Sequence, residues 1–243
     1  MKRIQLLSMY ILGIAAMVCM TGCKKDSYYE DKGIIDPKFN GTVIQYLQSN
    51  RYHLFDSLVR IIKLSGMENV FQNEQITFFA PADPSIINSL QTLNSYLLSQ
   101  GRDTISNLAQ LHPDFLKQQL SKYLFKGMRR LSDYPQLDPN NFRVYGGQYY
   151  TSYMGKNMLI GAVFYDAGGV QYAGYRQLYI GYPEGDTPPA GRLPDIFRVA
   201  TTDINPTNGI VHALNYSDAF FFGFSPNDFV VSAQNYGFDY SKK

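Results

Sequence analysis

The sequence predicts an α+β domain in which helices in the first half of the chain are followed by strands in the second half. Apolar residues recur at helical spacing up to about residue 127, and this period disappears from about Phe142. Beyond that point, glycine pairs and an Asn-Gly pair separate short aromatic and β-branched runs, which is typical of hairpins. Helices first and strands afterwards favour an α+β arrangement in one domain.

The N-terminus has the pattern of an export signal that ends at a cysteine. A basic start at residues 1–3 precedes a largely apolar run over residues 4–20, and Thr-Gly-Cys23 follows directly. An ordinary signal peptide or a transmembrane anchor are the alternatives. The run is short for a membrane span and is interrupted by Ser8 and Gly13. The segment resembles the lipobox of bacterial lipoproteins, in which the Cys becomes the lipidated N-terminus.

This resemblance implies that residues 1–22 are a signal peptide and that Cys23 is the lipid attachment site, carrying palmitate-type acyl chains. Lys24 rather than Asp follows the Cys, which in lipoproteins favours the outer membrane. The charged residues 24–31 resemble the surface-export signals of Bacteroidetes lipoproteins. Residues 23–39 are largely polar without an apolar period, so they predict a tether. We expect a lipid-anchored outer-membrane protein exposed at the cell surface, with the periplasmic face as the alternative.

Two helices are predicted at the start of the folded domain. Thr42 has Gln45 three residues later, which is the spacing of a capping box, and apolar residues continue to Leu47. Apolar residues over 54–64 then repeat at helical spacing. Gly66 follows them as a C-terminal stop.

A buried strand and two further helices come next. Residues 76–80 form a β-branched and aromatic run that is too short for a helix. Asp83 is expected to be the N-cap of a helix with Pro84 in its first turn, and the apolar stripe of this helix ends before Gly101. Another amphipathic helix is predicted over residues 113–127.

Strands and turns fill the second half of the chain. The candidate strands lie near residues 149–153, 158–165, 175–180, 196–202 and 210–214. The Pro- and Gly-rich segment 182–194 predicts an exposed loop. Residues 225–243 are interpreted as a polar C-terminal tail, which leaves one domain over residues 40–224.

Two segments together resemble the signatures of the fasciclin (FAS1) domain. Residues 76–86, Ile-Thr-Phe-Phe-Ala-Pro-Ala-Asp-Pro-Ser-Ile, are similar to the first signature, in which a buried strand ends at Ala-Pro before a capped helix. Residues 208–214, Asn-Gly-Ile-Val-His-Ala-Leu, are similar to the second, an Asn-Gly turn that leads into an apolar strand with an embedded His. The order of the helices also fits, and the resemblance covers about residues 42–221.

The fasciclin resemblance implies a wedge-shaped α+β fold, with a small β-sandwich flanked by N-terminal helices. It also implies a role in adhesion and recognition at cell surfaces rather than in catalysis. The sequence departs from the family before Gly127, where Lys122-Tyr123 stands in place of the Tyr-His pair of many fasciclin domains. The adhesion that is ascribed to the Tyr-His pair in the family is therefore not expected of this chain on that ground. The stretch from Gly127 to Asn208 is also long, and residues 182–194 are the expected insertion.

Composition excludes several classes of protein. Once residues 1–22 are removed, the chain has 20 basic and 20 acidic residues, so it lacks the cationic surplus of a nucleic-acid-binding protein. The chain has two cysteines, Cys19 in the signal and Cys23 at the lipid site. The mature fold therefore has no thiol for a disulfide, a metal or a nucleophile. We expect no cofactor and no metal.

Catalytic motifs are also missing. His53, His112 and His212 have no second ligand at a metal-binding interval, and His212 is expected to be a buried structural residue. No nucleophile elbow, phosphate loop or dinucleotide fingerprint occurs. The alternative is a carbohydrate-active enzyme that uses two loop carboxylates. Its candidate acids are Asp166, Glu184, Asp186 and Asp195.

Tyrosine is concentrated between residues 145 and 182. Strand propensity and partial burial explain many of these residues, but Tyr also favours protein and glycan recognition. Tyr149, Tyr150 and Tyr175 are the candidate ligand-binding residues. The sequence thus predicts a non-enzymatic cell-surface adhesion or recognition lipoprotein that binds a protein or glycan ligand. An accessory subunit of an outer-membrane nutrient-uptake complex is a further alternative.

Overall fold

Helices and strands occur along the chain largely as the sequence predicts. The computed structural model describes residues 37–185 and 191–242. The expected signal peptide, Cys23 and Asp186 lie outside these residues, as does most of the tether. Residues from Pro37 onward form one unit. Among the described residues, no helix combines the length and hydropathy needed to cross a bilayer.

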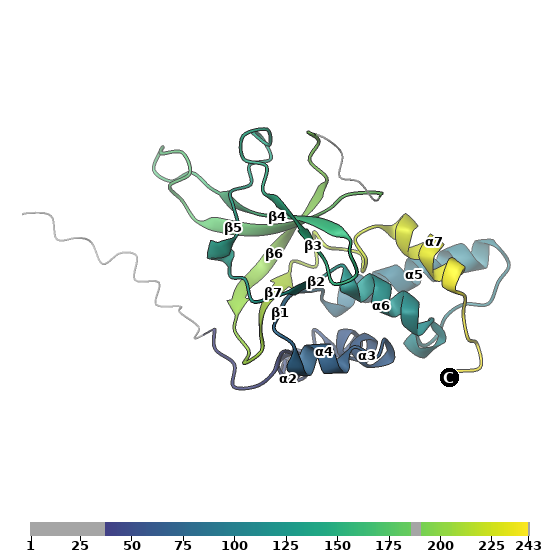
Figure 1. The fold of residues 1–243 in the computed structure, drawn as a ribbon. Helices are drawn as coiled ribbons and strands as arrows, with labels where there is room; N and C mark the ends of the chain where they lie inside the picture. Colours follow the sequence, from purple (N-terminus) through teal and green to yellow (C-terminus); the bar gives the residue numbers. More distant parts are fainter. Residues whose placement is uncertain (1–36, 186–190, 243) are drawn as a thin grey trace, which may run out of the picture. The chain divides into compact units, whose positions relative to one another are not determined.

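Three short helices precede the first strand. Helix α2 (Val43–Gln48) begins at the predicted capping box, since the Thr42 side chain accepts from the Gln45 amide and the Gln45 side chain accepts from the Thr42 amide. Helix α3 (Asp56–Leu64) buries the predicted apolar stripe. Helix α4 (Glu68–Asn73) follows it and was not expected. In Figure 1 these helices lie together beneath β1 and β7.

Helix α5 (Asp83–Ser99) is present, but the predicted role of Asp83 is wrong. The N-cap of this helix is Ala82, and its side chain makes no capping bond. The Asp83 carboxylate instead accepts from the backbone amides of Ser57 at 2.9 Å and Leu58 at 3.4 Å. These amides belong to the open first turn of α3, so Asp83 caps a neighbouring helix rather than its own.

The helix predicted over residues 113–127 is also too long. Helix α6 (Pro113–Ser121) ends six residues early, and β2 (Leu124–Lys126) follows it. Strand β2 pairs antiparallel with β1 (Ile76–Ala80), placing Phe125 opposite Thr77. This tertiary pairing overrides the helical spacing of the local sequence.

The strands form one seven-stranded sheet with the order β2-β1-β7-β6-β5-β4-β3. Strands β1 and β7 are parallel, and every other neighbouring pair is antiparallel. The bounds of the strands not yet given are β3 (Gln148–Thr151), β4 (Asn157–Phe164), β5 (Arg176–Tyr182), β6 (Asp195–Ile204) and β7 (Gly209–Leu214). The candidate strands are thereby confirmed, and the expected loop 182–194 connects β5 to β6.

The two halves of this sheet face each other, which is how the expected sandwich is built. The register between β6 and β7 shifts twice between Val199 and Ile204, as at β-bulges that bend a strand. The Tyr134 ring then lies 6.3 Å from Phe79 of β1 and 5.3 Å from Tyr150 of β3. The edge strands β2 and β3 adjoin, because the amide of Tyr153 donates to the carbonyl of Leu124 at 2.8 Å. Figure 1 shows the upper strands folding over β2 and β1.

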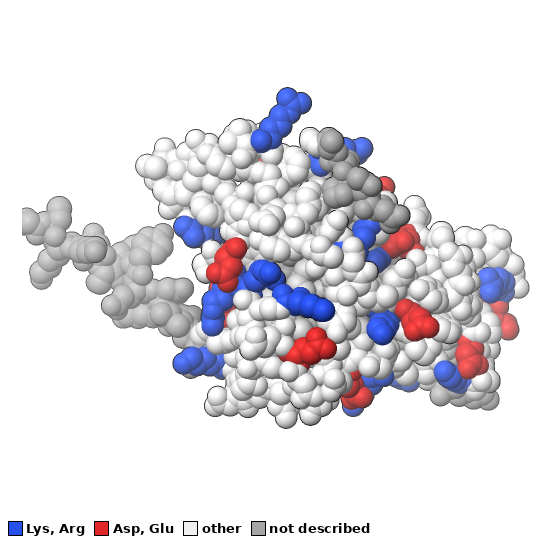
Figure 2. All heavy atoms as spheres, in the orientation of Figure 1, with Lys and Arg blue, Asp and Glu red and all other residues white. Residues whose placement is uncertain are grey.

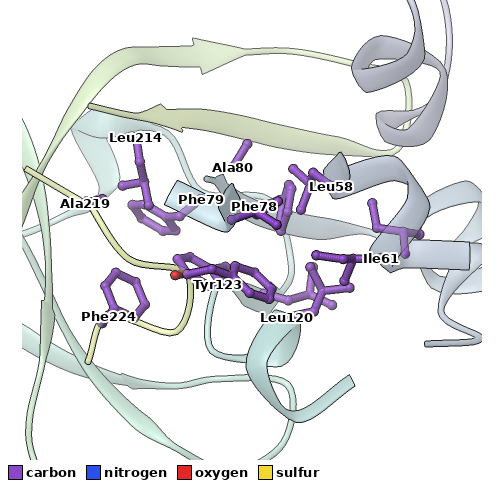
Figure 3. Close-up of a cluster of buried hydrophobic side chains, with 14 of the residues drawn as sticks. Leu58, Ile61, Phe78, Phe79, Ala80, Leu120, Tyr123, Leu214, Ala219 and Phe224 are labelled. Carbon is purple, nitrogen blue, oxygen red and sulfur yellow. The ribbon is translucent and has the colours of Figure 1, made fainter. Parts of the chain in front are cut away.

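The core joins α3, β1, α6 and the segment before the last helix. Figure 3 shows Tyr123 among these elements, with Phe78, Leu120 and Phe224 around it. The Tyr123 ring is fully buried and lies 4.4 Å from the Phe224 ring. Its hydroxyl accepts from the Gly223 amide at 2.6 Å. Burial raises the pKa of Tyr123, so this hydroxyl stays neutral and structural.

The prediction of a polar tail over residues 225–243 is wrong. These residues include helix α7 (Pro226–Tyr236), whose N-cap is Ser225. Helix α7 packs on α5 and α6 and buries Phe229, whose ring lies 5.0 Å from that of Phe115. The domain therefore continues past residue 224. The Ser-Pro pair is the capped start of a helix rather than the start of a tail.

Candidate functional site

An open hollow of about 510 Å³ lies between the two edge strands of the sheet. We call it the edge groove. Strand β2, strand β3 and the β3–β4 turn supply most of its lining. Its residues are Phe125, Lys126, Arg129, Tyr150, Thr151, Ser152, Tyr153 and Gly155.

Two cations in the edge groove lie over tyrosine rings. The Arg129 guanidinium is 5.3 Å from the centroid of the Tyr150 ring, and the Lys126 ammonium is 5.6 Å from that of Tyr153. Neither cation forms an ion pair with a carboxylate among the described residues. The Tyr153 hydroxyl donates to the Glu74 carboxylate at 3.0 Å. The rings hold the cations in place by cation–π attraction, and their charges remain available to a ligand.

The predicted structural histidine fixes the backbone of Arg129. His212 is fully buried on β7, which confirms the prediction. The Asp203 amide donates to Nδ1 at 3.3 Å, so Nε2 carries the proton and donates to the Arg129 carbonyl at 3.0 Å. Burial lowers the pKa of His212 from its ordinary value to about 4. The Arg129 carbonyl and the Asp203 charge act in the opposite direction and raise this pKa, but burial is the larger effect. At neutral pH the ring is therefore uncharged and acts as a clamp.

A second hollow of about 430 Å³ adjoins the edge groove at the β3–β4 turn, and Gly155 lines both. We call it the Lys122 hollow. It contains a cation that is already neutralised, because Lys122, 7% exposed, pairs with Asp228 of α7. The Lys122 ammonium also donates to the side-chain oxygen of Gln119 at 2.8 Å and to the Gly223 carbonyl at 3.2 Å. This pair joins α6 to α7.

The pKa values of this pair reflect burial and mutual attraction. Burial lowers the pKa of Lys122, although the charge of Asp228 opposes this. Burial would raise the pKa of Asp228, but the Lys122 ammonium and the Tyr182 hydroxyl bring it below its ordinary value. The attraction between the two side chains favours the charged form of each, so they form an ion pair.

A third cation lies on a tyrosine ring at the rim of the Lys122 hollow. The Lys156 ammonium is 5.1 Å from the centroid of the Tyr182 ring. Each hollow also has one buried polar atom with no hydrogen-bond partner among the described residues. These are Ser152 Oγ in the edge groove and Gln118 Oε1 in the Lys122 hollow. Buried polar atoms without a partner are rare in folded proteins, so these two mark unusual points beside the hollows.

The structure separates the three predicted ligand-binding tyrosines. Tyr150 lines the edge groove, whereas the adjacent Tyr149 has a side chain on the opposite face of β3. Tyr175 lies just before β5, is 65% exposed and stacks on Tyr165 at 4.4 Å. The expected common aromatic face is thus not formed, and of the three residues Tyr150 is the one that lines the edge groove.

The candidate carboxylates fall into two other hollows. Asp166 lines one with Asp138, which accepts from the Tyr172 hydroxyl at 2.7 Å. That hydrogen bond holds the pKa of Asp138 below its usual range, unlike that of a general acid. Glu184 and Asp195 line the other. Over residues 37–185 and 191–242, no cluster of three or more His, Cys, Asp or Glu side chains could hold a metal ion.

The remaining histidines lie at helix starts. His112 is the N-cap of α6 and accepts from the Asp114 amide at 3.2 Å. His53 is exposed and lies 3.1 Å from the Asp56 carboxylate. Neither residue lines the edge groove or the Lys122 hollow.

Sequence reasoning missed the cations of both hollows. Lys126, Arg129 and Lys156 contact rings from other strands, and no local spacing signals such pairs. Lys122-Tyr123 was noticed only as a departure from the fasciclin pattern. In the structure Tyr123 is core and Lys122 is an ion-pair partner.

Comparisons with known proteins find similarity among solved structures. No protein-family model matches the chain, and no curated protein matches it. A similar solved structure is that of a FAS1 domain pair from the insect cell adhesion molecule fasciclin I, with 15% identity and a TM-score of 0.45. The similarity covers 74% of this chain and 52% of the other, so this chain spans about half of its length.

Proposed function

We propose that the protein is a non-enzymatic recognition lipoprotein of the cell surface, and that it binds a protein or glycan ligand at the edge groove. The observation that carries the proposal is the pairing of Tyr150 and Tyr153 with unneutralised cations in an open hollow. Tyrosine and arginine are the residues that most often dominate binding surfaces. Tyr150 is the predicted residue that lines this groove.

Membrane attachment through Cys23 is part of the proposal. It is supported by the lipobox-like sequence and by residues 23–36, which separate the lipid site from the described unit. Several acyl chains on one N-terminus would anchor the protein stably. Mass spectrometry of the mature N-terminus should find acylated Cys23, and protease treatment of intact cells should release the domain from an outer-membrane surface. An unmodified Cys23 or a protected domain would contradict this part.

The groove itself is better suited to binding than to catalysis. Among its lining residues there is no carboxylate, histidine or cysteine. Ser152 Oγ has no hydrogen-bond partner among the described residues, so no neighbouring base activates it as a nucleophile. The loop acids lie in other hollows. Turnover of a glycoside that stops when Asp166, Glu184 or Asp195 is neutralised would overturn the proposal in favour of a carbohydrate-active enzyme.

An array of glycans and cell-surface proteins, probed with the purified full-length chain, tests the proposal. Tyr150→Leu should abolish binding to a ligand found on the array, because it removes the ring beneath Arg129. Tyr175→Leu is the matched control, since the same substitution is made away from the groove. Thermal melting should show that both variants are folded. Loss of binding in Tyr175→Leu alone would move the site away from the groove.

A further inference from the structure

We propose that the ligand of the edge groove is an anionic glycan, whose carboxylate or sulfate groups are bound by Lys126, Arg129 and Lys156 on the two sides of the β3–β4 turn. This inference rests on the proposed recognition function and names the chemistry of its ligand. The two hollows meet at Gly155, so a chain of several sugars can contact both.

The three cations are presented in the same way. Each lies between 5.1 and 5.6 Å from the centre of a tyrosine ring. A ring beneath a cation limits the motion of the flexible side chain and lowers the entropy lost when a ligand binds. In Figure 2, Lys and Arg side chains lie across the middle of the visible face together with Asp and Glu side chains.

The charge balance of the two hollows is positive. The Asp228 carboxylate is the acid that lines them, and Lys122 neutralises it. Glu74 lies at the edge, where its carboxylate accepts from the Tyr153 hydroxyl. Asp133 also lies near Tyr150 and Arg129. Lys126, Arg129 and Lys156 outnumber Glu74 and Asp133 by one, although the mature chain as a whole is predicted to be neutral. The excess is local, which fits a ligand with a few spaced anionic groups.

Hydroxyl chemistry favours a sugar over other anionic polymers. Ser152 is only 5% exposed, and its Oγ has no hydrogen-bond partner among the described residues. Gln118 Oε1 is buried, likewise without such a partner, and it can only accept. A sugar ring carries hydroxyl groups, which both donate and accept, beside its acidic group. A carboxylate or a phosphate diester by itself supplies no donor to Gln118 Oε1.

Binding of defined oligosaccharides to the full-length chain in detergent tests the inference. The probes are a sulfated hexasaccharide, a uronic-acid hexasaccharide and a neutral glucose hexasaccharide. At least one anionic probe should bind more tightly than the neutral probe, and its affinity should fall as NaCl rises. Replacing Lys126, Arg129 or Lys156 singly by Gln should weaken binding roughly three- to fivefold, which is the size of a partly exposed ion pair.

Matched controls separate this inference from general attraction between charges. Lys63→Gln removes the same charge from the exposed face of α3 and should leave binding unchanged. Ser152→Ala removes the unpartnered hydroxyl without changing charge and should weaken glycan binding. Equal affinity for polyglutamate or single-stranded DNA of matched charge would overturn the assignment to a glycan.

The outcome also distinguishes failure of the inference from failure of the proposed function. If a ligand on the array depends on Tyr150 but ignores NaCl and all three Gln substitutions, recognition at the groove stands and the anionic-glycan inference fails. If no ligand depends on Tyr150, both fail.

Discussion

Protonation of His212 should link stability to pH in a defined window. The folded pKa is about 4, and the ordinary value of 6.5 applies to the unfolded chain. Because the folded value is the lower one, the unfolded state binds more protons between these limits, and stability falls as the pH falls through the window. Between about pH 7 and about pH 5, this single group should cost about 2 kcal/mol of unfolding free energy.

His212→Gln provides the comparison, because a Gln amide can still donate to the Arg129 carbonyl but does not titrate. Urea denaturation at a series of pH values gives the unfolding free energy of each protein. We expect the variant to be less stable at neutral pH, since its shape differs from that of the buried ring, and to lose less stability on acidification. Other titrating groups are common to both proteins, so equal slopes between these pH values would refute the reasoning.

Three further predictions concern stability. Asp83→Ala should lower the unfolding free energy by about 1 kcal/mol through loss of the α3 cap, whereas Asp83→Asn should lose less; denaturation curves measure both. Phe229→Ala should lower the unfolding free energy by about 3 kcal/mol, because α7 belongs to the core. An unchanged melting temperature would support the tail interpretation instead. Lys122→Met should cost about 2 kcal/mol by leaving Asp228, 38% exposed, without its partner; adding Asp228→Asn should recover part of this loss in a double-mutant cycle.

The fold could be predicted where local chemistry agrees with tertiary structure. The capping box at Thr42 and the apolar stripe of α3 are local signals that the structure bears out. The prediction of helix over residues 122–127 was wrong because Phe125 pairs with Thr77, which is distant in sequence, and this pairing makes the segment a strand. The prediction for Asp83 was wrong for a similar reason. The sequence indicated that Asp83 caps a helix, but the amides that its carboxylate binds belong to another helix.

The site was less predictable than the fold. The abundance of Tyr indicated a binding surface, yet alternation along β3 places Tyr149 and Tyr150 on opposite faces. The cations of the groove come from β2 and from the segment after it, and they meet Tyr150 and Tyr153 only because the sheet bends until its edges adjoin. The bulges that bend the sheet lie in β6, so the sequence around the cations and the tyrosines gives no sign that they meet.

Hydrogen–deuterium exchange of the full-length chain, with and without a ligand identified on the array, tests the central claim most directly. If recognition occurs at the edge groove, bound ligand should slow amide exchange over residues 124–130 and 149–156, and this protection should be absent in Tyr150→Leu. Exchange over residues 165–176, around Tyr175, should be unchanged. Protection confined to residues 165–176, or to the loop acids near Glu184 and Asp195, would contradict the account.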